Sequence, residues 1–376
     1  HLDGRSGRNR GTDRQQIAAT DDRSAVLAWL ARYADSAATL ASYRKEAERL
    51  LLWCVFQRQA ALSDLTHEDL LLYQRFLANP EPFDRWVMAA RQKPSRASPL
   101  WRPFAGPLGA VSVRQALSII NSLFTWLVHA GYLAGNPLAL ARRQRVNRTP
   151  TVARFLPLAH WQEVRKTIES MPTQTVREAA HAARVRWLFS LLYIGGLRVS
   201  EVCGSIMGGF FNRRSADGKE RWWLEVNGKG AKLRLVPATD ELMRELIRYR
   251  RAWKLEALPN SLDAQPLLLP IIGLAKPMAR TAIHEIVKAV MHATAQRLRE
   301  QGGADQESAA AHIEQASTHW MRHTAGSHQS DAVDLKIVRD NLGHANIATT
   351  STYVHAEDDA RHDATSVAHR LSWSKL

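Results

Sequence analysis

Three short segments hold side chains whose types and spacing suit chemistry on a phosphate group. In the first segment, an apolar run over 191–194 is followed by Gly195 and Gly196 and then by Arg198. Glycines let the backbone approach a ligand closely, and a helix N-terminus favours anions, so an arginine there adds a guanidinium to an anion site. Glu201 lies one helical turn further on, where it is expected to orient Arg198. A surface or salt-bridged arginine is the alternative interpretation of this segment.

The second segment places His319 and Arg322 three positions apart, on one face of a predicted helix. An imidazole and a guanidinium that point to one place suit a phosphate, because one makes a single hydrogen bond and the other a fork. His319 and His323 also have the spacing of a zinc-binding helix. However, the glutamate of the HExxH pattern is missing and spacing indicates no third ligand, so neither a metal nor a cofactor is expected.

The third segment begins with a predicted helix that Gly343 ends. His344 then lies in a turn, and a threonine-rich stretch leads to Tyr353. Most tyrosines pack with a hydrogen-bonded hydroxyl at an interface, and composition alone does not separate that role from a chemical one.

Apolar residues at helical spacing predict that these segments are positioned by a mostly α-helical protein. Helices are expected at 24–33, 40–51, 66–76, 112–131, 161–171, 176–193, 240–253 and 281–298, with a further helical region at 318–371. At 222–226 and 233–237 the apolar residues instead recur at about every second position, as in a β-strand, and a glycine-rich turn separates these two runs. The predicted fold class is therefore mostly α with a small antiparallel β-sheet (α+β).

The chain divides into two predicted domains joined by a basic linker. Residues 1–20 are interpreted as a flexible basic arm, and 21–145 as a helical domain with a proline-rich insertion at 79–110. A linker at 146–156 leads to a second domain over 157–376, in which 301–317 is interpreted as a loop or insertion. A run of arginines around the linker suits contact with a phosphate backbone, with a solvated hinge as the alternative. These arginines are Arg142, Arg143, Arg145 and Arg148.

The charge balance favours a polyanionic partner. Lys and Arg number 51 against 36 Asp and Glu, a formal net charge of +15 over 376 residues. A positive surface steers phosphate ligands and exchanges counterions, so nucleic acid is the expected partner, with a merely soluble cationic surface as the alternative. The two cysteines lack zinc spacing and are expected to be reduced in a cytoplasmic setting. No stretch approaches about 18 consecutive apolar residues, so no membrane contact is expected.

Together, the order and spacing of the motifs resemble the tyrosine recombinase, or phage integrase, family, with an Xer-like catalytic domain. The resemblance covers about 150–370 and rests on Gly-Leu-Arg-x-x-Glu, Gly-Lys-Gly-x-Lys, His-x-x-Arg-His, Leu-Gly-His and a later tyrosine. It implies that Tyr353 is the nucleophile and that Lys229 is the general acid for the leaving 5′-oxygen, with Lys232 as a competing candidate. The other catalytic residues that it implies are Arg198, His319, Arg322 and His344, with Glu201 and His323 in supporting roles.

The same resemblance implies a two-domain DNA clamp, in which 22–145 is similar to the family's helical core-binding (SAM-like) domain and Lys232 joins the linker arginines in contacting DNA. The implied activity is metal-independent cleavage and rejoining of double-stranded DNA through a 3′-phosphotyrosyl link, for integration or excision of a mobile element. Such an enzyme acts as a homo-oligomer, a tetramer on two DNA sites, and an accessory recombinase or DNA-bending protein is a further expected partner. A bacterial or phage-encoded, nucleoid-associated protein is implied. The alternatives are a type IB topoisomerase-like enzyme and a non-cleaving DNA-binding regulator.

Overall fold

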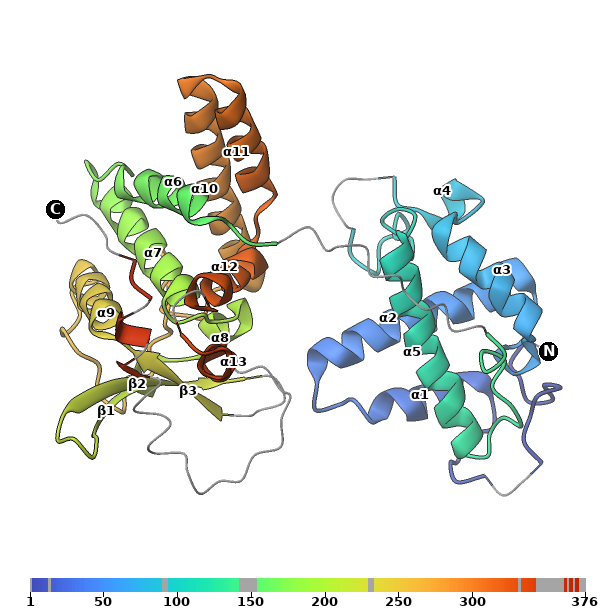
Figure 1. Cartoon of the computed structure of the whole chain (residues 1–376). Coiled ribbons are helices and arrows are strands. Elements are labelled where there is room, and N and C mark those ends of the chain that lie inside the picture. Colours follow the sequence, from blue (N-terminus) through green and yellow to red (C-terminus); the bar gives the residue numbers. More distant parts are fainter. Residues whose placement is uncertain are drawn as a thin grey trace. The chain divides into compact units, whose positions relative to one another are not determined.

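The computed structural model describes residues 2–12, 15–89, 94–141, 154–228, 233–330, 333–342, 362–363, 365–367 and 369–371. The chain forms two compact units, His1–Asn147 and Arg148–Leu376, and each is described by itself (Figure 1). The boundary between them falls inside the stretch that the sequence suggests as a linker, 146–156.

Unit 1 is helical. Its α-helices are α1 (Asp22–Ala31), α2 (Ala37–Trp53), α3 (His67–Ala78), α4 (Phe83–Trp86) and α5 (Ala110–His129), with a π-helical turn at Cys54–Arg58 and a 3-10 turn at Leu62–Asp64. Capping boxes begin two of them, Asp21 with Ser24 at α1 and Thr66 with Asp69 at α3. Such side chains satisfy N–H groups that the first turn of a helix leaves without partners. The four helices predicted in this half of the chain are confirmed to within a few residues.

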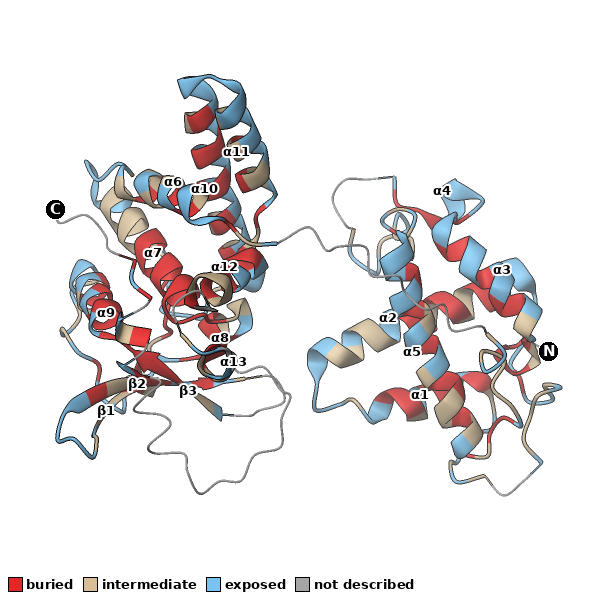
Figure 2. Ribbon diagram, in the orientation of Figure 1, coloured by how far each residue is buried: buried red, intermediate tan, exposed pale blue. Residues whose placement is uncertain are grey.

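Helix α5 supplies much of the core of unit 1. Its buried face includes Val113, Ile120, Phe124 and Leu127, and Figure 2 shows this burial along the helix. Among the described residues, α5 is the one helix long and apolar enough to cross a membrane by length and composition, a test that the core helix of a soluble protein also passes.

The first residues of unit 1 pack against its body. The main-chain N–H of Asn9 donates to Ser63 O at 2.9 Å, and that of Gly11 donates to Tyr132 O at 3.0 Å. The guanidinium of Arg10 lies over the ring of Tyr132, 3.9 Å from its centroid, and donates to its hydroxyl. The interpretation of this stretch as a flexible arm is therefore corrected, because backbone hydrogen bonds and a cation–π contact hold its described residues in place.

The proline-rich stretch at 79–110 also contributes to the core of unit 1. Trp86 and Phe104 are both buried. Their rings meet Phe76 of α3 edge-on, with centroids 4.9 and 5.6 Å away. The described part of this stretch is therefore built into the unit through aromatic packing.

Unit 2 contains the remaining helices. They are α6 (Leu158–Glu169), α7 (Val176–Tyr193), α8 (Val199–Gly204), α9 (Asp240–Ala252), α10 (Arg280–Gln301), α11 (Ala304–Gln315), α12 (Thr318–Ser330) and α13 (Leu335–Leu342), with a 3-10 turn at Met207–Gly209. The helices predicted at 161–171, 176–193, 240–253 and 281–298 are confirmed. Helix α7 runs through the core, and its second half is buried (Figure 2).

Helix α11 occupies most of 301–317, the stretch that the sequence analysis interprets as a loop or insertion. Gly302 and Gly303 have φ values of +75° and +102°, which allow the chain to reverse. Helix α11 then returns along α10, where Arg299 meets Glu307 at 3.2 Å. The loop alternative is wrong because the glycines mark only the turn, and the alanine-, glutamate- and glutamine-rich residues after it are strong helix formers. The alternative that this stretch is an insertion stays a prediction.

A small antiparallel sheet lies beside these helices. Its strands are β1 (Phe210–Arg214), β2 (Glu220–Asn227) and β3 (Leu233–Ala238), in the order β1-β2-β3. In the register of β2 with β3, Leu224 is opposite Val236, and both are buried. The predicted hairpin is confirmed, and the structure adds β1 as a third strand. The predicted class, mostly α with one small antiparallel sheet, is confirmed as well.

Candidate functional site

The glycine pair before α8 makes the turn that leads to Arg198. Gly196 has a φ of +55°, a left-handed conformation that residues with a side chain rarely adopt. A Cβ atom at this position would lie 2.7 Å from Cδ2 of Leu342, the last residue of α13. The turn therefore needs glycine for its conformation and for the close approach of α13.

Arg198 and Glu201 cap the start of α8 together. The main-chain N–H of Arg198 donates to Glu201 Oε2 at 2.8 Å, and Arg198 Nη1 donates to Glu201 Oε1 at 2.7 Å. The side chain of Glu201 is 1% exposed and that of Arg198 is 32% exposed. The structure thus places Glu201 beneath Arg198 and leaves part of the Arg198 side chain open to solvent.

A second cation, Arg234 of β3, shares the Glu201 carboxylate. Its Nη2 donates to Oε2 at 2.7 Å and its Nε donates to Oε1 at 3.2 Å. Burial by itself would raise the pKa of Glu201, but the hydrogen bonds and charges of Arg234 and Arg198 bring this pKa below its usual value. Glu201 is therefore an anion at neutral pH, flanked by two guanidinium groups.

Arg322 of α12 is held by main-chain oxygens. It is buried, and its guanidinium donates to the carbonyl oxygens of Gly196 and Leu342. Burial, followed by the nearby charges of Arg234 and Arg198, lowers the pKa of Arg322 to about 9. Arg322 still carries its charge at pH 7, so it is a fixed cation inside the unit.

His319 and His323 lie on the exposed face of the same helix. Their Nε2 atoms are 2.9 Å apart, so one ring donates to the other. Burial, followed by the charges of neighbouring groups, lowers the pKa of both imidazoles. In the part of the chain that the structure describes, no group of three His, Cys, Asp or Glu side chains is arranged to hold a metal ion.

The described residues that the sequence singles out come together as one cluster. Arg198 and Glu201 are in direct contact, and the charges of Arg198 and Arg322 both act on His319. The sequence interpretation misses Arg234. Its signal is weak, a charged residue between two leucines in the strand next to the Gly-Lys-Gly turn. Nothing in that pattern shows that the side chain meets Glu201.

The other predicted site residues lie outside the described residues. They are Tyr353, His344, Lys229, Lys232, Arg142, Arg143, Arg145 and Arg148. The described chain ends on either side of Lys229 and Lys232 at Gly228 and Leu233, and on either side of His344 and Tyr353 at Leu342 and His362. The proposed roles of these residues stay predictions.

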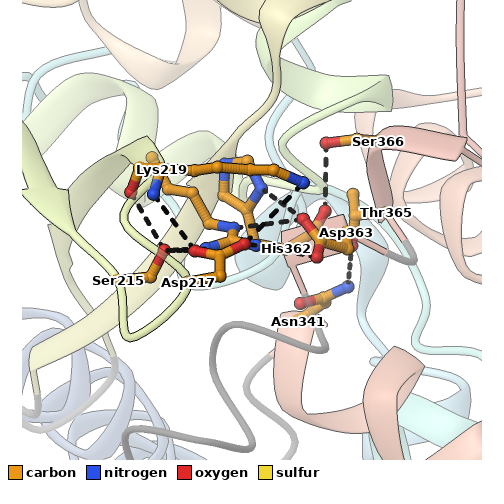
Figure 3. Close-up of polar contacts among 9 residues, drawn as sticks. Ser215, Asp217, Lys219, Asn341, His362, Asp363, Thr365 and Ser366 are labelled. Atoms are coloured by element: carbon orange, nitrogen blue, oxygen red, sulfur yellow. Dashed lines mark hydrogen bonds and ion pairs between the residues drawn. The ribbon is translucent and has the colours of Figure 1, made fainter.

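The described residues after Tyr353 pack against the sheet and helices of unit 2, the unit to which they belong. Asp363 accepts hydrogen bonds from Arg221 of β2 at 3.1 and 2.8 Å, and Asp217 in the β1–β2 turn is a second partner of that arginine. Asn341 Nδ2 donates to Thr365 Oγ1 at 2.7 Å. Figure 3 shows Asp217 and Lys219 of the turn facing His362 and Asp363. The described parts of this segment therefore pack within the unit that also carries Arg198 and Arg322.

Comparison with known proteins identifies relatives of this chain. The model of the Phage integrase family matches residues 162–360, more than half of the chain. Tyrosine recombinase XerC of Mycobacterium tuberculosis (strain ATCC 25177 / H37Ra) is 31% identical over 263 residues, 67% of this chain and 76% of the relative. Tyrosine recombinase XerC 2 of Ralstonia nicotianae is 27% identical over 334 residues, 88% of this chain and 81% of the relative.

Solved structures share the fold. The XerH site-specific recombinase bound to palindromic difH substrate has a TM-score of 0.52 at 17% identity, over 87% of this chain and 80% of that one. The Tn1549 transposon integrase in complex with transposon right end DNA has a TM-score of 0.51 at 14% identity, over 89% of this chain and 98% of that one. By sequence and fold, this chain belongs to the phage integrase family and is a tyrosine recombinase, an enzyme of site-specific recombination.

Proposed function

We propose that this enzyme cleaves double-stranded DNA by transferring a strand end to Tyr353, and rejoins it by reversing that transfer. The observation that carries the proposal is Arg322, a buried cation held by the carbonyls of Gly196 and Leu342. Within the described part of the chain, no carboxylate forms a salt bridge with Arg322. Its charge is therefore available to a phosphate, and Arg198 adds a second, partly exposed guanidinium.

The charged cluster suits the transfer of a phosphodiester, in which negative charge builds up on the phosphate oxygens. A phosphodiester resists attack because its two non-bridging oxygens repel a nucleophile and gain charge in the transition state. Fixed guanidinium groups stabilise that charge, and removing one such donor typically slows a reaction by about 100- to 1000-fold. Arg198 and Arg322 supply this stabilisation in the proposed mechanism, and the imidazoles of His319 and His344 add hydrogen bonds.

Proton transfer completes the proposed step. The phenol oxygen of Tyr353 attacks phosphorus, and the bond from phosphorus to the 5′-oxygen breaks. His319 or His344 takes the phenol proton, and the lowered pKa of His319 favours the neutral imidazole that a base requires. Lys229 gives a proton to the leaving oxygen, with Lys232 as the alternative donor. The phosphotyrosyl link conserves the bond energy, so a 5′-hydroxyl from another strand can reverse the step.

We propose that a tetramer of this chain holds two DNA sites. Unit 1 and four arginines contact the DNA in this proposal, and these arginines are Arg142, Arg143, Arg145 and Arg148. The net charge of +15 supports DNA as the partner. XerH and the Tn1549 integrase, which share the fold, were solved on DNA. We further propose a cytoplasmic enzyme that integrates or excises a mobile element, with an accessory recombinase or a DNA-bending protein as a partner.

A nicked suicide duplex tests the proposal. Cleavage next to the nick releases a short oligonucleotide, so rejoining fails and the covalent complex accumulates. Wild-type protein is expected to form a complex that resists denaturation, and Tyr353→Phe is expected to form none while binding the duplex normally. An undiminished complex with Tyr353→Phe would refute the proposal.

Recombination and simple strand relaxation differ in their products. A recombinase given two cognate duplexes is expected to produce Holliday junctions. A topoisomerase-like enzyme relaxes one supercoiled circle without producing them, so relaxation without junctions would favour that alternative.

A further inference from the structure

Arg234 lies where three elements of the site meet. It is the second residue of β3, and its Nε and Nη2 donate to the two carboxylate oxygens of Glu201 in α8, at 3.2 and 2.7 Å. Its Nη1 donates to the main-chain oxygen of Asn341, near the end of α13. Only 11% of its side chain is exposed. One partly buried guanidinium thus joins the sheet, the start of α8 and the end of α13.

Arg234 and Arg322 act together on α13. Arg234 binds the carbonyl of Asn341, and Arg322 binds the carbonyl of the next residue, Leu342. The last carbonyls of a helix have no partner within the helix, and they form the negative end of its dipole. Two guanidinium groups therefore cap consecutive carbonyls, immediately before the segment that contains His344.

Arg234 also contacts the carboxylate that orients Arg198. Each carboxylate oxygen of Glu201 accepts one hydrogen bond from Arg198 and one from Arg234. The hydrogen bonds of Arg234 therefore help to fix the orientation of this buried carboxylate. Without Arg234, the Glu201 carboxylate would lose two of these four hydrogen bonds, and the position of Arg198 on it would be less fixed.

We infer that Arg234 is a positioning residue for strand cleavage, which holds Glu201, and through it Arg198, while fixing the end of α13 that leads to His344. The inference rests on the proposed function and adds to it a residue that acts without touching the DNA. Three nitrogens of the guanidinium make these contacts at once. A lysine has one terminal nitrogen and cannot span them, so the two side chains are not equivalent at this position.

The test compares Arg234→Gln and Arg234→Lys in the full chain. Two quantities are measured, the single-turnover rate of covalent complex formation on the nicked duplex at saturating protein, and the dissociation constant for an intact duplex. Arg234→Gln is expected to slow cleavage on the order of 100-fold, because small displacements of catalytic groups cost that much. Arg234→Lys, which keeps the charge, is expected to lie between this variant and wild type. The dissociation constant is expected to stay unchanged.

A double variant tests the route through Glu201. If Arg234 acts by holding this carboxylate, Glu201→Gln already removes most of its effect. The slowing in Arg234→Gln/Glu201→Gln is therefore expected to be far smaller than the product of the two single effects.

Arg186→Gln is the matched control. Arg186 of α7 forms a buried fork with Glu245 of α9 at 2.7 and 2.8 Å, and neither residue is one of the predicted site residues. Its replacement breaks a buried ion pair in the same unit, so it reports the effect of lost stability alone. Arg186→Gln is expected to cleave at the wild-type rate.

Several results would overturn the inference. Wild-type cleavage by Arg234→Gln or an equal slowing in Arg186→Gln would each do so, and multiplying effects in the double variant would exclude the route through Glu201. A loss of DNA affinity as large as the loss of rate would make Arg234 a direct DNA contact instead. Failure of the proposed function looks different, because wild-type protein itself would then form no complex through Tyr353.

Discussion

The guanidinium of Arg322 donates to the carbonyl oxygen of Gly196, two residues before Arg198. This bond ties α12 directly to the turn that begins α8. The two predicted catalytic arginines, far apart in the sequence, are therefore held by one short stretch of main chain. Their relative position depends on the shape of that turn, which makes the turn a sensitive place to test the site.

Replacement of Arg322 by lysine tests whether the site needs the two separate donor nitrogens of the guanidinium. A lysine keeps the charge but cannot span the carbonyls of Gly196 and Leu342 from one nitrogen. Arg322→Lys is expected to bind DNA and to form the covalent complex about 100- to 1000-fold more slowly. The rate is measured in single turnover on the nicked duplex, with DNA affinity measured in parallel. Cleavage at the wild-type rate would remove Arg322 from the mechanism.

An added methyl group at Gly196 tests the turn. Gly196→Ala forces a side chain into the left-handed region, which costs about 1–2 kcal/mol, and its Cβ would meet Leu342. Lower thermal stability and slower cleavage are expected. Gly204→Ala is the control, because a Cβ there would meet nothing within 4 Å. Equal stability of the two variants would contradict this account of the turn.

Acid is expected to destabilise the protein through His369. This imidazole is 1% exposed and donates to the carbonyl of Tyr193, and burial lowers its pKa from 6.5 to about 4. Between these two values the unfolded chain binds a proton that the folded chain does not bind. The free energy of unfolding therefore falls as pH drops from 6.5 towards 4, by at most about 3 kcal/mol from this group.

His369→Gln tests that assignment, since an amide can still donate to Tyr193 but does not titrate. Denaturant unfolding at pH 7 and pH 4.5 is expected to show a smaller acid loss in this variant than in wild type. His129→Gln, which changes an exposed histidine at the end of α5, is the control. An identical pH dependence in His369→Gln and wild type would exclude His369 as the cause.

Removal of divalent metal is expected to leave cleavage unchanged. In the proposed mechanism, guanidinium and imidazole groups supply the charge stabilisation that a metal ion provides in other phosphoryl-transfer enzymes. The measurement is the cleavage rate with and without EDTA at constant ionic strength, because salt alone changes DNA binding. Strong inhibition by the chelator would show that a metal takes part.

Local sequence patterns predict most of the fold because they reflect local physics. The apolar face of α5 and the capping box of Thr66 and Asp69 lie within single elements, and both helices form where they are expected. The N-terminal stretch was harder to predict. Its position depends on Arg10 meeting Tyr132, a contact between residues far apart in the chain that charge content does not indicate.

The same distinction applies to the site. Arg198 and Glu201 sit within one turn of each other, so spacing alone suggests their contact, and the structure places them together. Arg234 joins Glu201 to Asn341, partners that are brought close only by the packing of β3, α8 and α13. A contact of this kind follows from tertiary structure and has no local signature.

The chemical identity of the protein–DNA link is the decisive measurement for Tyr353 as the nucleophile. Covalent complex trapped on a nicked duplex is digested with nuclease and protease, and the peptide that keeps a nucleotide is sequenced by mass spectrometry. A single modified peptide is expected, with the nucleotide on the phenol oxygen of Tyr353. A nucleotide attached to any other residue, or a complex without a covalent link, would contradict it.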